Sequence, residues 1–492
     1  MREIARTDLL RRIQAENPWW VSGHVGAPLE GLRPRAYFGL FLPLVKALEI
    51  RRAVVLMGPR RVGKTVLIHQ AIDALLGEGV APRQIAYLSV DHPLYTGQGL
   101  EDLLDLYFDA ARPESGQPIY VFFDEIQYLR DWEVHLKVLV DEHPTMKAVA
   151  SGSAAAALSL KSRESGAGRF TDFLLPPLTF YEYLDLVGEL DLVAEEPSIG
   201  SSRFFKATDI DGLNRRFIHY LNFGGYPEIL FTPAAQADPG RFIKSDIIDK
   251  VLLRDLPSLY GISDIQELNR LFTSLAFNTA GEVSLQDLAS DSGVAKNTLK
   301  RYTTYLEAAF LIRVVHRVDE SARHFKRARN FKVYLTNPSM RAALFSPVDD
   351  NSAEVGALAE TAIFSQWFHS DELNLYYARW KDGEVDIVRL GADQRVKWAV
   401  EVKWSDRYAE KPRELKSLVN FCRKNGLSRG WATSRTVRTD LDVDDIRLSI
   451  IPTSVYCFTL GHNIIHEKKE RGPHRPPDSG LIPSGSARRP HP

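Results

Sequence analysis

The sequence has few cysteines, no long apolar segment and no excess of charge of either sign. Only two of its 492 residues are cysteines, Cys422 and Cys457, so neither a disulfide framework nor a cysteine-based zinc site is expected. No apolar run approaches the roughly 18 residues of a membrane span, and arginines interrupt the N-terminal stretch that a secretory signal would keep apolar. We therefore expect a soluble cytoplasmic protein that does not bind a membrane.

The balance of charge also limits the classes of partner. The chain has 62 Lys and Arg against 63 Asp and Glu, a formal net charge of −1. Such a protein has no global attraction to nucleic acid, so any affinity of this kind must come from local basic patches. Because 44% of the residues are hydrophobic, we expect folded domains, and the length suggests about three of them.

Near-continuous apolar strands alternate with helices in the first third of the chain. This pattern indicates an α/β fold, with a parallel sheet that is covered on both faces. The first predicted strand begins at Ala53, and the next three span 84–91, 118–125 and 146–153. The predicted helices include 99–111 and 131–142.

The first predicted strand leads into a phosphate-binding motif. Residues 58–65 read GPRRVGKT, which satisfies G-x-x-x-x-G-K-[ST] between a strand and a helix. Backbone N–H groups of such a loop bind phosphate, Lys64 neutralises the β- and γ-phosphates, and the Thr65 hydroxyl ligates Mg²⁺. ATP and Mg²⁺ are the predicted cofactors. The predicted binding residues are Gly58, Pro59, Arg60, Arg61, Val62, Gly63, Lys64 and Thr65.

Two acidic residues follow the third predicted strand. Asp124 emerges from the carboxyl end of this buried strand, where the phosphate loop also opens, and we expect it to hold Mg²⁺. Glu125 is placed to orient or deprotonate the attacking water. The alternative is an ordinary pair of acidic residues on a surface turn.

Further residues are candidates for contact with the γ-phosphate. Ser151 and Ser153 end the fourth predicted strand, which we expect beside the third, and either hydroxyl could sense the γ-phosphate. Arg169 could stabilise charge in the transition state, from the same or a neighbouring subunit. It could equally be a plain surface arginine.

An ordered set of segments resembles a known family. The segments are GPRRVGKT, FFDEIQYLRDW, ASGSAAAAL, Gly168-Arg169, PLTFYEY, GGYPE and LLRDL. The set is similar to that of prokaryotic AAA-type ATPases whose C-terminal half is a domain of unknown function with a restriction-endonuclease-like end. The resemblance implies a helical lid after the ATPase core and a winged helix before the terminal domain. One departure is Asn337, which stands where the family usually has an aspartate.

Charged residues on two predicted C-terminal strands indicate a second site. Glu384 and Asp386 lie two apart and share one strand face, as do Glu401 and Lys403. The arrangement resembles that of PD-(D/E)XK nucleases, which implies Asp386 and Glu401 as metal ligands and Lys403 as the catalytic lysine. By the same resemblance, Glu360 completes the metal shell. The alternatives are solvated cross-strand pairs, or a nuclease fold that binds without cutting.

Basic residues near the middle of the chain suggest contacts with DNA. A predicted helix-turn-helix around Gly293 places Lys296, Asn297, Thr298, Lys300 and Arg301 on its second, recognition-like helix. A basic stretch follows between 313 and 332. The alternative is that the winged helix only packs against its neighbours and that these charges are solvated. The basic residues of this stretch are Arg313, Arg317, Arg323, Lys326, Arg327, Arg329 and Lys332.

These observations predict an α/β protein of five segments. They are an AAA-type P-loop core with an N-terminal extension (1–175), a helical lid (176–262), a winged helix-turn-helix (263–345), a PD-(D/E)XK nuclease-like domain (346–462) and a disordered tail (463–492).

The leading hypothesis is an ATP-hydrolysing protein that acts on DNA through a Mg²⁺-dependent nuclease-like domain. The alternative is a nucleotide-switched module that binds DNA or a protein through a catalytically inactive nuclease fold. A homo-oligomer is compatible with both hypotheses, because AAA-type cores often use arginines across subunits.

Overall fold

A computed structural model describes residues 5–27, 29–152, 168–197, 203–323, 330–370 and 374–471. The chain divides into two compact units, Met1–Pro176 and Pro177–Pro492. The finer division of the second unit into three segments and a tail stays a prediction. In the part of the chain that the structure describes, no helix is long and apolar enough to cross a membrane.

The N-terminal unit is built on a parallel sheet of five strands in the order β2-β3-β4-β1-β5. The predicted parallel sheet is thus confirmed, and β4 pairs with β3 as expected. β5 was not predicted; it pairs with β1 at the edge of the sheet and is half exposed. The strands are β1 (Ala53–Met57), β2 (Ile85–Ser89), β3 (Ile119–Asp124), β4 (Met146–Gly152) and β5 (Phe170–Leu174).

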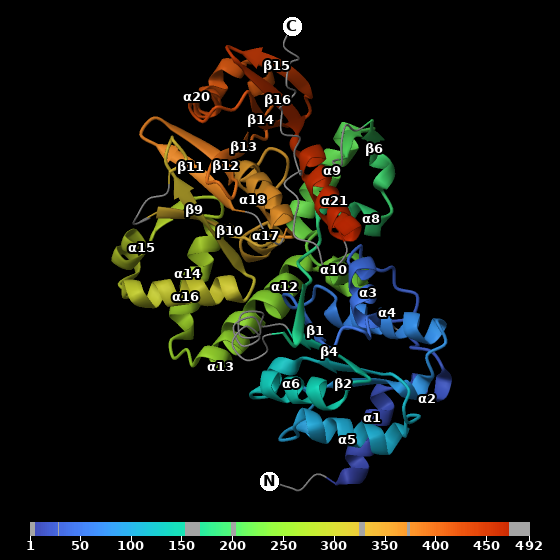
Figure 1. Ribbon diagram of the computed structural model, residues 1–492. Helices are drawn as coiled ribbons and strands as arrows, with labels where there is room; N and C mark the ends of the chain where they lie inside the picture. The colour runs from blue at the N-terminus through green and yellow to red at the C-terminus, as the bar shows by residue number, and fades with distance from the viewer. Residues whose placement is uncertain are drawn as a thin grey trace. The chain divides into compact units, whose positions relative to one another are not determined.

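Helices cover both faces of this sheet (Figure 1). α4 follows the first strand on one side, with α3 against it, while α5 and α6 pack together on the other side. Each crossover returns the chain to a parallel strand, as an α/β sheet requires. The helices of this unit are α1 (Arg6–Glu16), α2 (Trp19–Ser22), α3 (Phe38–Lys46), α4 (Lys64–Gly77), α5 (Leu100–Ala111) and α6 (Trp132–Glu142).

The N-terminal extension closes one edge of the sheet. The Asn17 amide donates to the backbone oxygen of Tyr87 at 2.9 Å and accepts from its N–H at 2.6 Å. The indole N–H groups of Trp19 and Trp20 both donate to the carbonyl of Ile85. Side chains therefore satisfy backbone groups of the edge strand β2 that another chain could otherwise pair with.

The C-terminal unit contains a mixed sheet of nine strands in the order β15-β16-β14-β13-β12-β11-β9-β10-β8. The helices predicted on both sides of Gly293 are present, and the strands that flank them join the same sheet as the later strands. The strands are β8 (Glu282–Ser284), β9 (Ile312–Val318), β10 (Asn330–Leu335), β11 (Leu375–Trp380), β12 (Gly383–Leu390), β13 (Val396–Glu401), β14 (Arg429–Ser434), β15 (Thr439–Val443) and β16 (Ile446–Pro452).

Helices from the start, the middle and the end of this unit form much of its core. α18 packs against α21, and α21 packs against α8 and α9. The helices are α8 (Phe180–Val187), α9 (Ile210–Phe223), α10 (Pro227–Phe231), α11 (Pro233–Ala237), α12 (Pro239–Ile243), α13 (Leu256–Tyr260), α14 (Ile265–Phe277), α15 (Leu285–Ser292), α16 (Lys296–Ala308), α17 (Ser339–Leu344), α18 (Val355–Trp367), α19 (Arg407–Glu410), α20 (Lys416–Lys424) and α21 (Thr453–Arg471).

Two parts of this unit differ from the prediction. The segment expected to be a helical lid also contains a hairpin of β6 (Val193–Glu196) and β7 (Phe204–Ala207), and π-helical turns over Lys244–Asp249 and Val251–Asp255. Residues 463–471 were expected to begin a disordered tail but form the end of α21. The reason is that Ile464 and Ile465 bury their side chains in the core, which holds the helix in place. Residues 472–492 lie outside the described part of the chain.

Candidate nucleotide site and a buried charge cluster

The predicted phosphate loop lies between β1 and α4, at the carboxyl edge of the parallel sheet. Gly63 adopts a φ of 95°, a left-handed conformation that favours glycine, immediately before α4. Gly58 is needed for a different reason, since a Cβ at this position would lie 2.2 Å from the backbone oxygen of Leu175. Each glycine of the motif therefore has a steric reason of its own.

Lys64 is buried and its side chain folds back along the loop. Its Nζ donates to the carbonyls of Gly58 at 3.0 Å and Pro59 at 2.9 Å. A bound phosphate would offer the ammonium a stronger, charged acceptor than these neutral carbonyls. The lysine is thus held at the loop in a position from which it can reach an anion.

Asp124 lies at the centre of a network of hydroxyl groups. Its Oδ2 accepts from the Thr65 hydroxyl at 2.7 Å and from the Tyr87 hydroxyl at 2.8 Å. Its Oδ1 accepts from the Ser151 hydroxyl and from the backbone N–H of Glu125, the latter at 3.1 Å. The structure therefore brings together the predicted magnesium-binding pair, Thr65 and Asp124, with Ser151 beside them. Ser153 lies outside the described residues.

Glu125 has a left-handed backbone with a φ of 56°, which is uncommon for a residue with a side chain. Its carboxylate accepts a hydrogen bond from the amide of Gln127. Such conformations cost free energy and are concentrated at functional sites. The position next to Asp124 is compatible with the predicted role in orienting water.

The sequence did not reveal two residues that support this site. Tyr87 lies on β2, and it reaches Asp124 only because β2 and β3 are neighbours in the sheet. Arg35 precedes the sheet; it is buried and donates to the carbonyl of Val62 in the loop at 3.0 Å and to that of Pro176 at 2.8 Å. Both contacts depend on tertiary structure, so a linear motif carries no signal for them.

Arg169 lies at the amino ends of the parallel strands, whereas the phosphate loop of its own chain lies at their carboxyl ends. Its backbone oxygen accepts from the N–H of Ala53 at the start of β1, whereas the loop begins after the end of this strand at Met57. The five residues of β1 separate the two positions by about 16 Å. The Arg169 guanidinium forms an ion pair with Asp141 at 2.5 Å.

The residues predicted to form the second site also converge, within the C-terminal unit. Glu360 comes from α18, Asp386 from β12 and Glu401 from the end of β13. Lys403 Nζ lies 2.7 Å from Glu401 Oε1 and 3.7 Å from Asp386 Oδ2. The carboxylates of Glu360 and Asp386 are brought together by contacts with the same residue, Lys332.

Lys332 was expected on a basic surface, but it is buried in this cluster, with 4% of its side chain exposed. Its Nζ lies 2.7 Å from Glu384 Oε1, 3.0 Å from Glu360 Oε1 and 3.5 Å from Asp386 Oδ1. The expectation was wrong because Lys332 lies on β10 inside the sheet, where these carboxylates compensate its charge. Among the residues that the structure describes, no group of three or more His, Cys, Asp or Glu residues is arranged to hold a metal ion.

Burial and mutual charge perturb the acids of this cluster. Burial, followed by the neighbouring Asp386 carboxylate, raises the pKa of Glu360 to about 7 and that of Glu401 to about 8. Burial alone would lower the pKa of Lys332, but attraction to Glu360 and the other carboxylates raises it well above its ordinary value. The ammonium is therefore a fixed positive charge at physiological pH.

The proposed DNA-facing residues are only partly described. Lys296, Asn297, Lys300 and Arg301 are exposed along the first half of α16, and Thr298 is half-buried there. In the basic stretch that follows, Arg313 and Arg323 are exposed and Arg317 pairs with Glu282 at 3.6 Å. Lys326, Arg327 and Arg329 lie outside the described residues.

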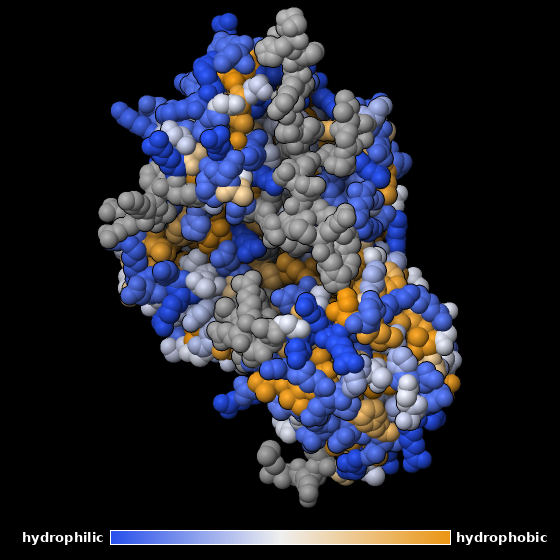
Figure 2. Space-filling model, in the orientation of Figure 1, coloured by the Kyte–Doolittle hydropathy of each residue, from blue (hydrophilic) through white to orange (hydrophobic). Residues whose placement is uncertain are grey.

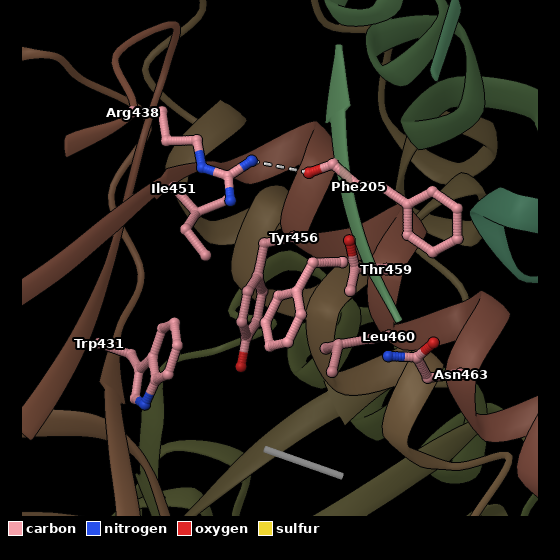
Figure 3. A pocket seen from close by; sticks show the side chains of 9 residues that line it. Phe205, Trp431, Arg438, Ile451, Tyr456, Thr459, Leu460 and Asn463 are labelled. Atoms are coloured by element: carbon pink, nitrogen blue, oxygen red, sulfur yellow. Dashed lines mark hydrogen bonds between the residues drawn. The ribbon is translucent and has the colours of Figure 1, made fainter. Parts of the chain in front are cut away.

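A small pocket in the C-terminal unit is a further candidate for binding. Figure 3 shows Trp431, Tyr456 and Leu460 around it, with Arg438 at its rim donating to the carbonyl of Phe205 at 2.9 Å. Its volume is about 30 Å³, and it adjoins a more open pocket of about 240 Å³, with which it shares Trp431 and Arg438. Arg438 also pairs with Glu196 at 2.6 Å, so its charge is already compensated.

Two segments of the chain match known protein families. Residues 50–184 match a model described as an AAA domain, and residues 214–351 match a domain of unknown function, DUF8612. An uncharacterized protein of Haemophilus influenzae is 25% identical over 298 residues, which cover 58% of this chain and 68% of the relative. An uncharacterized protein of Methanocaldococcus jannaschii is 25% identical over 295 residues, which cover 57% of this chain and 60% of the relative.

Solved structures with some similarity include an AAA domain and Hsp104, each in complex with ADP. The FIGL-1 AAA domain in complex with ADP is 18% identical, with a TM-score of 0.28, and the match covers 46% of this chain and 77% of that one. The Saccharomyces cerevisiae Hsp104–ADP complex is 15% identical, with a TM-score of 0.27, over 54% of this chain and 37% of that one. On the family match and the geometry of the phosphate loop, the chain combines an AAA-type P-loop ATPase domain with a downstream domain of unknown function.

Proposed function

We propose that the protein hydrolyses ATP with Mg²⁺ and that the nucleotide state of the N-terminal unit controls DNA binding by the C-terminal unit. The observation that carries the first part is the network around Asp124. A hydroxyl and a carboxylate 2.7 Å apart, Thr65 and Asp124, are hard oxygen donors of the kind that Mg²⁺ prefers. The metal would neutralise charge on the β- and γ-phosphates when ATP is bound.

The residues of this chain have separate roles in the proposed reaction. The loop backbone and Lys64 bind the phosphates, and Glu125 orients the attacking water. Ser151 donates to the Asp124 carboxylate, and its Oγ accepts from the backbone N–H of Glu125 at 3.4 Å. It therefore holds both residues in place. A shift of Asp124 or Glu125 on loss of the γ-phosphate would therefore also move the end of β4, where Ser151 lies.

The exposed basic residues at the start of α16 favour DNA as the partner. Three exposed basic side chains, Lys296, Lys300 and Arg301, lie close together in sequence on this helix, which follows a turn at Gly293. In a helix-turn-helix, the N-terminal residues of the second helix contact the groove. A near-neutral chain needs such a local patch to bind phosphate groups.

Fluorescence anisotropy with a labelled DNA duplex tests the DNA-binding proposal. We expect the triple variant Lys296→Glu, Lys300→Glu and Arg301→Glu to bind the duplex far more weakly. The slope of log affinity against log salt concentration should also become shallower, by about 0.9 for each phosphate that is no longer neutralised. A matched control reverses three exposed charges elsewhere in the same unit, Lys206→Glu, Arg215→Glu and Arg241→Glu. Equal affinities for the two triple variants would contradict the assignment of α16.

For the C-terminal cluster we favour the alternative in which this fold binds without cutting. Support comes from Lys332, whose charge lies among the carboxylates that a nuclease would use for Mg²⁺. A plasmid incubated with the full chain, ATP and Mg²⁺ should stay intact. Cleavage that Asp386→Ala abolishes would restore the nuclease hypothesis.

A homo-oligomer is part of the proposal. Apolar residues are visible on the face of the N-terminal unit that Figure 2 shows, and Tyr128 and Val134, shortly after the nucleotide site, are 40% and 50% exposed. Exposed apolar surface of this kind often marks a contact with another protein. Since Arg169 lies far from the phosphate loop of its own chain, a neighbouring copy is the route by which it would reach a nucleotide.

A further inference from the structure

The Lys332 ammonium has the surroundings of a bound cation. Carboxylate oxygens of Glu384, Glu360 and Asp386 lie 2.7, 3.0 and 3.5 Å from its Nζ. An ammonium has three N–H donors, so three carboxylates can satisfy it completely. The ring of Tyr377 lies 5.4 Å from the same nitrogen, which adds a cation–π contact.

The oxygens around Lys332 have other partners as well. Glu360 Oε1 accepts from the Tyr334 hydroxyl at 2.6 Å. Asp386 Oδ2 accepts from the backbone N–H of Val402 at 2.9 Å. A Mg²⁺ ion would need such oxygens at about 2.1 Å in an octahedral arrangement. It could enter only if the lysine left, because both cations require the same carboxylates.

We propose that Lys332 is the resident cation of this cluster and that it takes the place of a divalent metal ion. The cluster binds no metal while β10 stays in the sheet. The lysine comes from the segment that matches the domain of unknown function, residues 214–351, whereas the carboxylates of Glu360, Glu384 and Asp386 follow that segment. The buried ion pairs thus join the two parts of the C-terminal unit.

The cluster keeps one oxygen that a metal could still attract. Glu401 Oε2 is buried and has no hydrogen-bond partner among the described residues. Its other oxygen pairs with Lys403 at 2.7 Å. One open oxygen is too few to hold a divalent ion, but removal of Lys332 would make three more available to it. A variant without the lysine charge should therefore gain a metal site.

Electron paramagnetic resonance with Mn²⁺ on the full chain, without nucleotide, tests this proposal. We expect Lys332→Gln to bind one more Mn²⁺ per chain than the unsubstituted chain, because the carboxylate oxygens that the ammonium occupies become available. Adding Glu360→Gln to that variant should abolish the gain. The control is Lys397→Gln, which removes an exposed lysine that pairs with Asp393 at 2.9 Å and should leave Mn²⁺ binding unchanged.

A second measurement decides the question even if Lys332→Gln fails to fold. The melting temperature of the unsubstituted chain is compared with that of Asp386→Asn, with and without about 10 mM Mg²⁺. If Mg²⁺ shifts both melting temperatures equally, or shifts neither, the result supports a cluster whose carboxylates are occupied by Lys332. A metal-induced rise, or tight Mn²⁺ binding, that Asp386→Asn abolishes would overturn the proposal. ATP turnover is not involved, so either outcome leaves the nucleotide site untouched.

Discussion

The Tyr87 hydroxyl is a sensitive test of the network around Asp124. It donates to Asp124 Oδ2 at 2.8 Å, from a strand that carries no part of the phosphate-binding motif. Burial, and then the Asp124 carboxylate, raises the pKa of Tyr87, so the hydroxyl stays protonated and keeps donating. Tyr87→Phe removes this donor but keeps the ring, which packs 4.6 Å from the ring of His69.

The size of the effect follows from the number of donors that remain. A hydrogen bond to a charged group contributes about 1.5–3 kcal/mol. Thr65, Ser151 and the Glu125 N–H still satisfy the carboxylate, so the lower end of this range applies. We expect Tyr87→Phe to lower the free energy of unfolding by about 1.5 kcal/mol. If the transition state loses the same amount, kcat for ATP falls about 10-fold with KM little changed.

Tyr107→Phe is the matched control for this prediction. Tyr107 is also a buried tyrosine of the N-terminal unit. Its hydroxyl donates to a neutral acceptor, the backbone oxygen of Arg83, at 2.9 Å. We expect a stability loss of about 1 kcal/mol and normal ATP turnover. Steady-state kinetics and urea unfolding of both variants provide the comparison. Unchanged turnover by Tyr87→Phe, or an equal loss in Tyr107→Phe, would refute the reasoning.

Three further predictions concern other parts of the molecule. Gly58→Ala would place a methyl group 2.2 Å from the Leu175 carbonyl, so we expect loss of ATP binding in a fluorescent-nucleotide titration and a stability loss of about 1–3 kcal/mol. Burial lowers the pKa of His462 from 6.5 to about 3, so its contribution to stability is complete above pH 6.5 and falls as the pH drops below that value. Urea unfolding should show that the free energy of unfolding falls by about 2 kcal/mol less between pH 7 and about pH 5 in His462→Phe than in the unsubstituted chain. An equal fall in both proteins would show that His462 does not cause this pH dependence. If Arg169 acts across subunits, Arg169→Ala and Lys64→Ala should each be inactive alone, and a mixture of the two should regain ATP turnover, whereas no recovery would argue against action in trans.

The local parts of the nucleotide site could be predicted from the sequence. The phosphate loop is a contiguous motif between a strand and a helix, and Asp124 directly follows an apolar run, so both are visible without knowledge of tertiary structure. Tyr87 and Arg35 could not be found in this way. Their contacts depend on the order of strands in the sheet and on the path of the N-terminal segment.

The C-terminal cluster shows a different limit of sequence reasoning. Asp386 on β12 and Glu401 at the end of β13 lie together with Lys403, which follows just after β13, so the expected neighbours were found although the strand ends before the lysine. Lys332 was grouped with surface charges because it ends a basic stretch. On β10 it shares a face with Tyr334, while its apolar neighbours face the other way, so alternation would place it on a polar face; the carboxylates that surround it come from α18 and β12.

Release of phosphate from ATP in the presence of Mg²⁺ is the most direct test of the central claim. The full chain is compared with Lys64→Ala and with the control Lys46→Ala, which removes an exposed lysine that pairs with Glu78 at 2.6 Å. We predict that the unsubstituted chain and Lys46→Ala hydrolyse ATP at similar rates and that Lys64→Ala releases no more phosphate than buffer alone. Equal phosphate release by Lys64→Ala and the unsubstituted chain would contradict the assignment of residues 58–65 as the ATP-hydrolysing site.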